Sequence, residues 1–144
     1  MGKKKEKFLT VILDTNVLVS ALLFKGEVTH LADLWKAGKI RPVFSRATFA
    51  EFRKVLDYPK FRLSPLEIEA IIKEDILPFF GVIDSVKEIN GFCRDPHDDK
   101  FAALAIASNP AFLITGDDDL LCLKRIEKTQ IVKPGAFLRT IEKD

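Results

Sequence analysis

Cysteine and histidine are scarce in this chain, which has only two residues of each among 144. Cys93 and Cys122 lack the spacing of a thiolate metal site, and we expect both to be reduced thiols. The two histidines, His30 and His97, show no spacing to a serine or a carboxylate that would indicate a nucleophilic triad. A thiolate metal centre and triad chemistry are therefore not expected.

Long hydrophobic runs and glycine-rich loops are also missing. No stretch approaches the ~20 apolar residues that a membrane span requires. A lysine-rich start followed by the apolar residues 8–13 superficially resembles a signal peptide, but the apolar run is short and ends in Asp14. No glycine-rich loop of the kind that holds nucleotide phosphates is present. We expect a cytoplasmic protein without a membrane partner.

Positive and negative charges nearly balance, with 23 Lys and Arg against 21 Asp and Glu and a net charge of +2. This balance neither requires nor excludes a polyanionic partner. Local clusters say more, because lysines crowd residues 1–7 and basic residues recur between Arg41 and Arg62. We predict a basic, disordered N-terminus over residues 1–7 and a single domain over residues 8–142.

Short apolar runs alternate with amphipathic stretches along the chain. The apolar runs predict strands at residues 8–13, 40–44, 82–83, 111–115 and 130–132. Helical spacing and capping residues predict helices at 15–24, 28–37, 45–57, 64–78, from 98, from 117, and from 134. This alternation predicts a three-layer α/β/α fold with a central, mainly parallel sheet of four to five strands.

Four acidic residues stand where an oxygen-ligand metal site would need them. Asp14 and Asp117 each follow an apolar run directly, while Glu51 and Asp98 lie on amphipathic stretches. Carboxylates at the C-terminal ends of parallel strands and on adjoining helices can converge in one cleft. Because like charges repel, such a cluster is most stable around a cation, and oxygen ligands favour Mg²⁺ or Mn²⁺.

Each acid also has a purely structural explanation. Asp14 could simply cap the following helix, and Glu51 could be a solvated helical residue. Acids at the start of the helix near residue 98 also suit the positive end of its dipole. Helical spacing places Asp98 on the buried face and Asp99 about a quarter-turn away, so Asp98 is the preferred third acid and Asp99 the alternative.

Four segments together resemble the PIN-domain family, and in particular its VapC-like toxin ribonucleases. They appear in the family's order and extend over about residues 8–142. The segments are residues 13–18 (Leu-Asp-Thr-Asn-Val-Leu), the helix at 45–56, residues 93–100 (Cys-Arg-Asp-Pro-His-Asp-Asp-Lys) and residues 113–121 (Leu-Ile-Thr-Gly-Asp-Asp-Asp-Leu-Leu).

The resemblance implies a PIN-like fold and an endoribonuclease that uses Mg²⁺ or Mn²⁺ to cleave single-stranded RNA. It also implies a toxin of a toxin–antitoxin pair, with a small antitoxin protein as partner. Its catalytic acids would be Asp14, Glu51, Asp98 and Asp117. Of these, Asp14, Asp98 and Asp117 would bind the metal, and Asn16, Thr115 and Asp99 would support them. Candidate contacts to the RNA backbone are Arg41, Arg46, Arg53 and Lys100.

Two other functions and one assembly state also follow from the sequence. A haloacid-dehalogenase-like phosphatase would place an acid after its first strand, but it needs a second Asp where this chain has Asn16. A catalytically silent PIN domain could act as an interaction module. Apolar residues around the helix at 64–78, namely Phe61, Leu63, Phe79 and Phe80, predict a homodimer.

Overall fold

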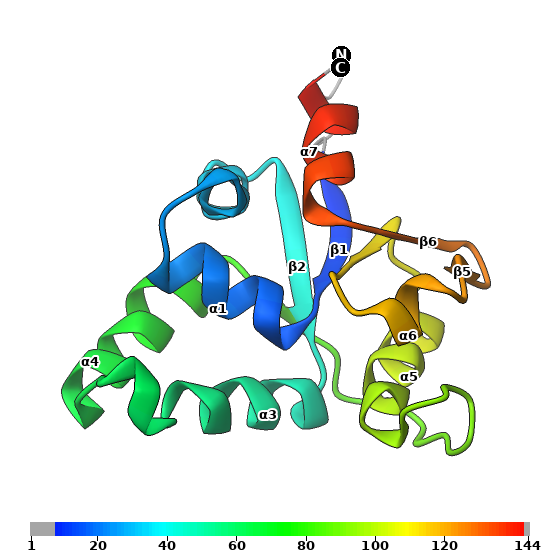
Figure 1. Ribbon diagram of the computed structural model, residues 1–144, viewed down its shortest axis with the longest axis horizontal. Coiled ribbons are helices and arrows are strands. Elements are labelled where there is room, and N and C mark those ends of the chain that lie inside the picture. The colour runs from blue at the N-terminus through cyan, green and yellow to red at the C-terminus, as the bar shows by residue number, and fades with distance from the viewer. Residues whose placement is uncertain (1–7, 143–144) are drawn as a thin grey trace, which may run out of the picture.

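A computed structural model describes residues 8–142 of the chain (Figure 1). The strands are β1 (Leu9–Leu13), β2 (Ile40–Phe44), β3 (Gly81–Val82), β4 (Phe112–Ile114), β5 (Arg125–Ile126) and β6 (Thr129–Val132). The helices are α1 (Thr15–Leu23), α2 (His30–Lys36), α3 (Arg46–Leu56), α4 (Pro65–Ala70), α5 (Asp99–Ser108), α6 (Asp118–Leu121) and α7 (Pro134–Glu142). The N-terminal segment predicted to be disordered, residues 1–7, lies outside the described residues.

The sheet has six strands in the order β3-β2-β1-β4-β6-β5. All neighbours pair in parallel except β5 and β6, which form an antiparallel pair at one edge. The predicted α/β fold with a mainly parallel sheet is confirmed, with one strand more than expected. That strand is β5, and its two residues are too few to produce a recognisable alternation of apolar and polar side chains.

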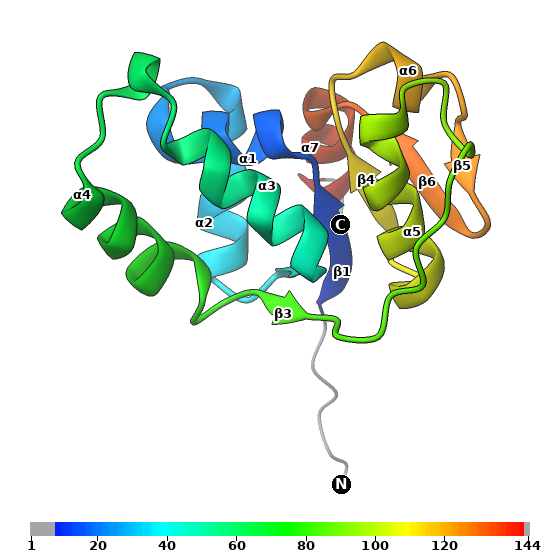
Figure 2. The same cartoon turned by 90° about the horizontal axis from the view of Figure 1, so that it is seen from below.

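Side chains alternate across the central strands and build one apolar core on each face of the sheet. Val11 and Leu13 of β1 join the core beneath α1, α2, α3, α4 and α7. Ile12 joins the core formed with α5 and α6. Figure 2 shows α1 to α4 on one side of β1 and α5 on the other. Burial on both faces explains why β1 reads as a continuous apolar run.

Helix α3 begins at a capping box immediately after β2. The Ser45 side chain accepts a hydrogen bond from the Thr48 backbone N–H, and the Thr48 hydroxyl accepts one from the Ser45 backbone. Phe52 and Leu56 face inward with no exposed surface. Because Glu51 precedes Phe52, its carboxylate is directed to the border between this core and solvent.

The segment at 64–78 differs from the single helix that the sequence predicts. Helix α4 ends at Ala70 and continues as a π-helix over Ile71–Ile76. Phe80 is only 7% exposed and belongs to the core, and Phe61, Leu63 and Phe79 pack against that core. Phe80 is therefore not part of a free apolar surface, whereas Phe61, Leu63 and Phe79 are only partly buried, and the dimer stays a prediction.

The order of strands reverses between β1 and β4. From β1 the chain builds outward to β2 and β3, then returns to place β4 on the other side of β1. In open parallel sheets this switch point opens a crevice at the C-terminal ends of the strands, where ligands bind. Asp14 follows β1 and Thr115 follows β4, so both lie at that crevice.

None of the helices within residues 8–142 is long and apolar enough to cross a membrane.

Phe52 tests the packing that holds α3 against the sheet. Replacing it by alanine should lower the free energy of unfolding by roughly 3–5 kcal/mol, because the side chain is fully buried and leaves a cavity. The matched control is Phe92→Ala, at a phenylalanine that is 45% exposed, which should cost under about 0.5 kcal/mol. Urea unfolding of both variants measures the difference, and equal losses would contradict this packing.

Candidate metal-binding site

Asp14 occupies the junction between β1 and α1, and its carboxylate has two protein partners. Its Oδ1 accepts a hydrogen bond from the Val17 backbone N–H at 2.9 Å and so caps α1. Its Oδ2 accepts one from the Thr115 hydroxyl. A carboxylate has about four acceptor positions, so these bonds orient Asp14 without saturating it. Helix capping and metal binding are therefore compatible roles for this residue.

Thr115 connects the two strand ends at the switch point. Its buried hydroxyl donates to Asp14 and accepts a hydrogen bond from the Asp117 backbone N–H at 2.9 Å. Asp117 in turn caps α6, because its Oδ2 accepts from the Leu120 backbone N–H at 3.2 Å. A single hydroxyl thus fixes the position of both acids.

Glu51 approaches the site from α3 and connects it to two other helices. Its carboxylate accepts hydrogen bonds from the Thr15 hydroxyl and from Lys100 Nζ, the latter at 2.7 Å. Lys100 also donates to the His97 carbonyl at 2.8 Å. One cation of the protein therefore already offsets part of the negative charge in this region.

The neighbouring acids Asp98 and Asp99 have different environments. Asp99 is buried and accepts hydrogen bonds from the backbone N–H groups of Gly91 and Cys93, at 2.9 and 2.7 Å. The Cys93 N–H bond holds the pKa of Asp99 below its usual range. Asp98 instead lies beside Asp117, and its buried Oδ2 has no hydrogen-bond partner within residues 8–142.

The expected orientation of these two acids was therefore wrong, since Asp99 and not Asp98 is the more buried. Helix α5 begins at Asp99, whereas Asp98 ends the preceding 3₁₀ turn over Pro96–Asp98. Extending the spacing of α5 back to Asp98 misplaces that side chain, because a 3₁₀ turn rotates it differently.

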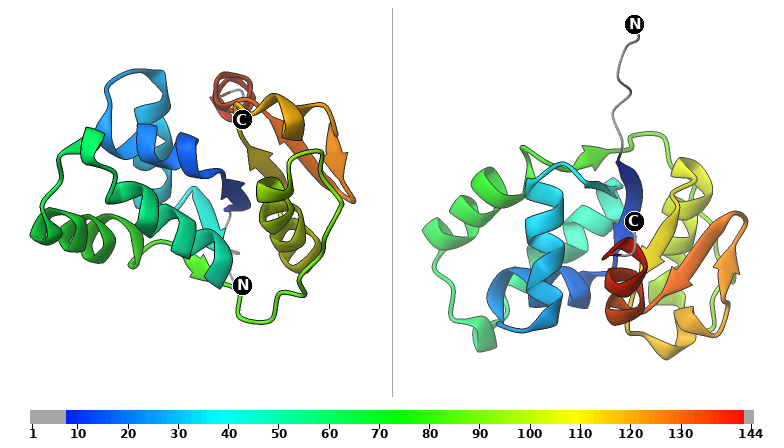
Figure 3. Two further views of the ribbon diagram at one scale, coloured as in Figure 1. Left: turned by 60° about the horizontal axis from the view of Figure 1, so that its bottom comes forward. Right: turned by 90° about the horizontal axis from the view of Figure 1, so that it is seen from above.

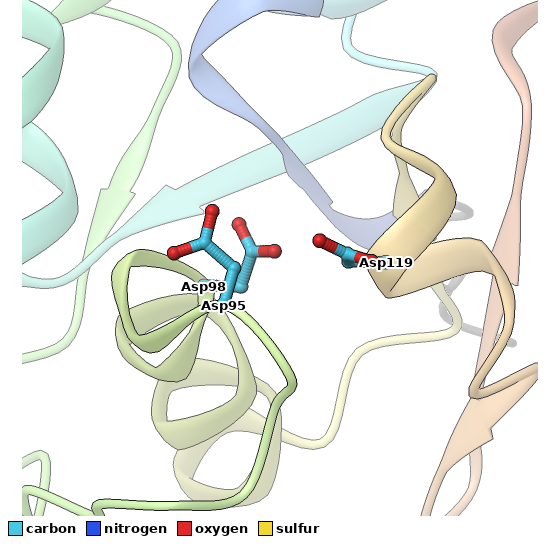
Figure 4. A group of neighbouring side chains, drawn as sticks. All are labelled: Asp95, Asp98 and Asp119. Atoms are coloured by element: carbon cyan, nitrogen blue, oxygen red, sulfur yellow. The ribbon is translucent and has the colours of Figure 1, made fainter.

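Two further acids join Asp98 that the sequence analysis did not select. Carboxylate oxygens of Asp95, Asp98 and Asp119 all lie within 4.8 Å of one another. Figure 4 shows the carboxylates of Asp95 and Asp98 side by side above their turn, with that of Asp119 extending towards them from α6. The run Asp117–Asp119, which contains more acids than a helix cap needs, was a signal in the sequence that could have suggested Asp119.

Burial and mutual repulsion perturb the acids at the strand ends. Burial raises the pKa of Asp14, and the carboxylates of Asp117 and Glu51 raise it further, against the hydrogen bonds from Thr115 and Val17. Burial and the neighbouring Asp117 carboxyl raise the pKa of Asp98 to about 7. Both shifts show that this region accommodates a full set of negative charges poorly.

The chemistry of these side chains suits a hard divalent cation. All donors are carboxylate oxygens, which such ions prefer. The Asp98 Oδ2 that lacks a hydrogen-bond partner is the kind of atom that a cation would satisfy. A cation would also offset the repulsion between Asp98 and Asp117, because it attracts both carboxylates.

A cleft of about 600 Å³ runs past these acids between α3 and the start of α5. Figure 3 (left) shows these helices on either side of the end of β1. Asp14, Asn16 and Asp117 line it, and they also line a second hollow of about 490 Å³ beside α6. Asn16 is exposed, consistent with a polar role at the cleft and not with packing.

The predicted RNA contacts are scattered over the molecule. Arg41 lies at the start of β2 beside Gly81, which is the opposite end of the sheet from the acids. Arg46 lines a neighbouring pocket, and Arg53 pairs with Asp57 at 3.5 Å. Lys100 does lie in the cleft.

Two lysines that the sequence analysis did not select, Lys54 and Lys60, also line the cleft. Lys54 is three residues from Glu51, so both project from the same face of α3. Arg53 is two residues from Glu51 and projects elsewhere. Counting helical positions from Glu51 would have identified Lys54.

Asp98 gives the metal-free protein an unusual pH dependence. Its pKa is near 4 in an unfolded chain and about 7 in the folded one. The folded state therefore binds more protons in this window, and stability should fall as pH rises from about 4 to about 7. Asp99, whose pKa is lowered, affects stability only below this window.

Thermal melts in chelator across this pH range measure the effect. Asp98→Asn should reduce the slope, with the raised pKa of Asp14 supplying the remainder, whereas Asp84→Asn, at an exposed acid outside the cluster, should leave it unchanged. Adding a divalent cation near pH 7 should raise the melting temperature of the unmodified protein, because ligands that bind the folded state stabilise it. Stability that rises with pH in chelator would contradict the assignment.

Comparison with known proteins shows which family this chain resembles. The family model described as the PIN domain matches residues 10–119. The uncharacterized protein MJ1680 of Methanocaldococcus jannaschii is 30% identical, with 99% of this chain and 98% of that protein covered.

Three solved structures share the fold at low sequence identity. FitAcB from Neisseria gonorrhoeae has a TM-score of 0.59 at 17% identity, covering 86% of this chain and 97% of that one. VapBC2 from Rickettsia felis, bound to a promoter DNA fragment, has a TM-score of 0.57 at 19% identity, covering 85% and 97%. PAE2754 from Pyrobaculum aerophilum has a TM-score of 0.56 at 16% identity, covering 95% and 97%. From the family match and the shared fold, this chain belongs to the PIN-domain family.

Proposed function

We propose that this protein is a Mg²⁺- or Mn²⁺-dependent endoribonuclease that cleaves single-stranded RNA and serves as the toxin of a toxin–antitoxin pair. The observation that supports the proposal is that Asp14, Asp98 and Asp117 line one cleft, with one buried carboxylate oxygen of Asp98 unsatisfied within residues 8–142. Membership in the PIN-domain family argues against the phosphatase considered from the sequence.

Asp14, Asp98 and Asp117 would hold the cation. When bound, it would supply electrostatic activation of the scissile phosphate and of the attacking water. Thr115 keeps the Asp14 carboxylate in one orientation through its hydrogen bond. Glu51, held by Thr15 and Lys100, stands at the side of the cleft where it can orient a water molecule.

Basic residues along the cleft would bind the RNA backbone. Lys54, Lys60 and Lys100 line it, and Arg46 shares the adjoining pocket with Lys100. Phosphate contacts of this kind supply affinity without reading sequence. A cleft set at strand ends admits a flexible single strand, whereas a duplex is too stiff to bend its backbone into it.

Partners follow from the structural relatives. FitAcB and VapBC2 share the fold of this chain, and VapBC2 is bound to a DNA fragment from a promoter. We extend the idea of a small antitoxin partner to this chain, and a small neighbouring gene whose product copurifies with it would support that extension. Homodimerisation stays a separate prediction, which sedimentation at tens of micromolar tests.

Cleavage should require both the acids and the metal. Purified protein with Mg²⁺ or Mn²⁺ should cut a single-stranded RNA and leave the same sequence largely intact when it is a duplex. Addition of a chelator should stop cleavage. Asp14→Asn should reduce the rate by more than about 100-fold, because it removes a ligand that the supporting residues serve to orient. Gel analysis of end-labelled RNA measures each rate.

Two variants separate loss of chemistry from loss of fold. Asn caps helices as well as Asp, so Asp14→Asn should melt near the temperature of the unmodified protein. Thr115→Val removes the hydroxyl that orients Asp14 and should lower the rate by roughly 10- to 100-fold. Cleavage that survives Asp14→Asn or chelator would refute the nuclease assignment. A folded, metal-binding protein that cuts no RNA would instead favour a silent interaction module.

A further inference from the structure

The face of α3 that carries Glu51 continues into an aromatic surface. Glu51, Lys54, Val55 and Tyr58 follow one another at helical spacing, and all line the 600 Å³ cleft. Tyr58 comes seven positions after Glu51 in the chain and two residues beyond the end of α3 at Leu56. Tyr58 is 43% exposed, a large exposed area for an aromatic side chain that lines a cleft. The acids thus lie at one end of this side of the cleft, and the exposed Tyr58 ring lies at the other end.

The backbone after Tyr58 is rigid. Pro59 begins a 3₁₀ turn that ends at Phe61, closed by a hydrogen bond from the Phe61 N–H to the Tyr58 carbonyl at 3.0 Å. The Phe61 ring packs against the Phe24 ring, with centroids 6.1 Å apart. Because proline and this packing restrict the turn, its backbone and the cleft-lining Phe61 ring lose little freedom on binding a ligand.

Positive charge accompanies the rings. Lys60 Nζ lies 5.2 Å from the centroid of the Phe61 ring, and Lys54 and Lys100 line the same cleft. Aromatic faces beside cations match a chain of alternating bases and phosphates, since bases stack on rings while phosphates bind lysine. A protein segment would have to be acidic as well as apolar to fit equally well.

We propose that Tyr58, supported by Phe61, is a stacking platform for an unpaired base of the RNA strand at the end of the cleft away from the acids. The inference rests on the proposed ribonuclease function and adds to it a means of selecting single strands. A base within a duplex is covered on both faces by its neighbours and cannot stack on Tyr58 without leaving the helix. The platform would not discriminate strongly among bases, because every base has a face that stacks.

The experiment measures binding and cleavage of a fluorescent single-stranded RNA in Mn²⁺. Tyr58→Ala should raise Kd and KM by roughly 5- to 150-fold, the range expected for losing one base–aromatic stack. The value of kcat should change much less, because the ring is remote from the acids. Tyr58→Phe keeps the ring and should recover most of the lost affinity. Phe8→Ala is the matched control, since Phe8 is 41% exposed and lies at the opposite end of the sheet.

A modified RNA provides a second, independent test. Removing single bases in turn around the cleavage position should locate one position where the loss weakens binding to the unmodified protein by a similar factor. At that position, base removal should weaken RNA binding to the Tyr58→Ala variant only slightly further, because the partner ring is already absent.

The outcomes distinguish this inference from the function on which it rests. RNA binding that depends on Tyr58 without any cleavage would uphold the platform and refute the nuclease. Metal-dependent cleavage with Kd and KM unchanged in Tyr58→Ala would overturn the platform alone and make this aromatic surface a protein contact. No binding and no cleavage by the unmodified protein would overturn both.

Discussion

The hydrogen bond from the Thr115 hydroxyl to Asp14 joins β1 and β4 at the point where the order of strands reverses. The rest of the site depends on this bond, because Thr115 also accepts from the Asp117 backbone and so fixes the second acid. Residues 101 positions apart are thereby held as one unit. The bond is buried, so water does not compete with it, and its loss would leave an unsatisfied polar group in the crevice.

Without a metal, the cluster reduces its own charge in two ways. Lys100 pairs with Glu51, and the raised pKa of Asp98 lets that carboxyl hold a proton near neutral pH. Both compensations are reversible, since Lys100 is partly solvated and a proton exchanges freely. These compensations lower the repulsion among the acids in the metal-free protein.

Much of this arrangement could be predicted from the sequence because local rules and global topology agree there. Asp14 and Asp117 directly follow buried strands, so a parallel sheet must bring them to one edge. The Ser45 cap likewise sets where α3 begins and hence which way Glu51 faces. Prediction failed where the local sequence pattern of a residue and its position in the fold point to different roles. Arg41 belongs to a basic run in the sequence, but its position at the start of β2 carries it away from the acids.

Asp98 and Asp99 show a second limit of sequence reasoning, since one residue decides between two roles. Asp99 holds the backbone at Gly91 and Cys93, whereas Asp98 faces Asp117 across the cleft. Replacing Asp99 would loosen the segment that precedes α5, whereas replacing Asp98 would remove a carboxylate from the cleft. Both changes would disturb the same region. An alanine scan scored by activity alone would therefore identify both Asp98 and Asp99 as metal ligands. Only a readout of local backbone order, such as amide exchange at Gly91 and Cys93, separates the residue that shapes the cleft from the one that faces into it.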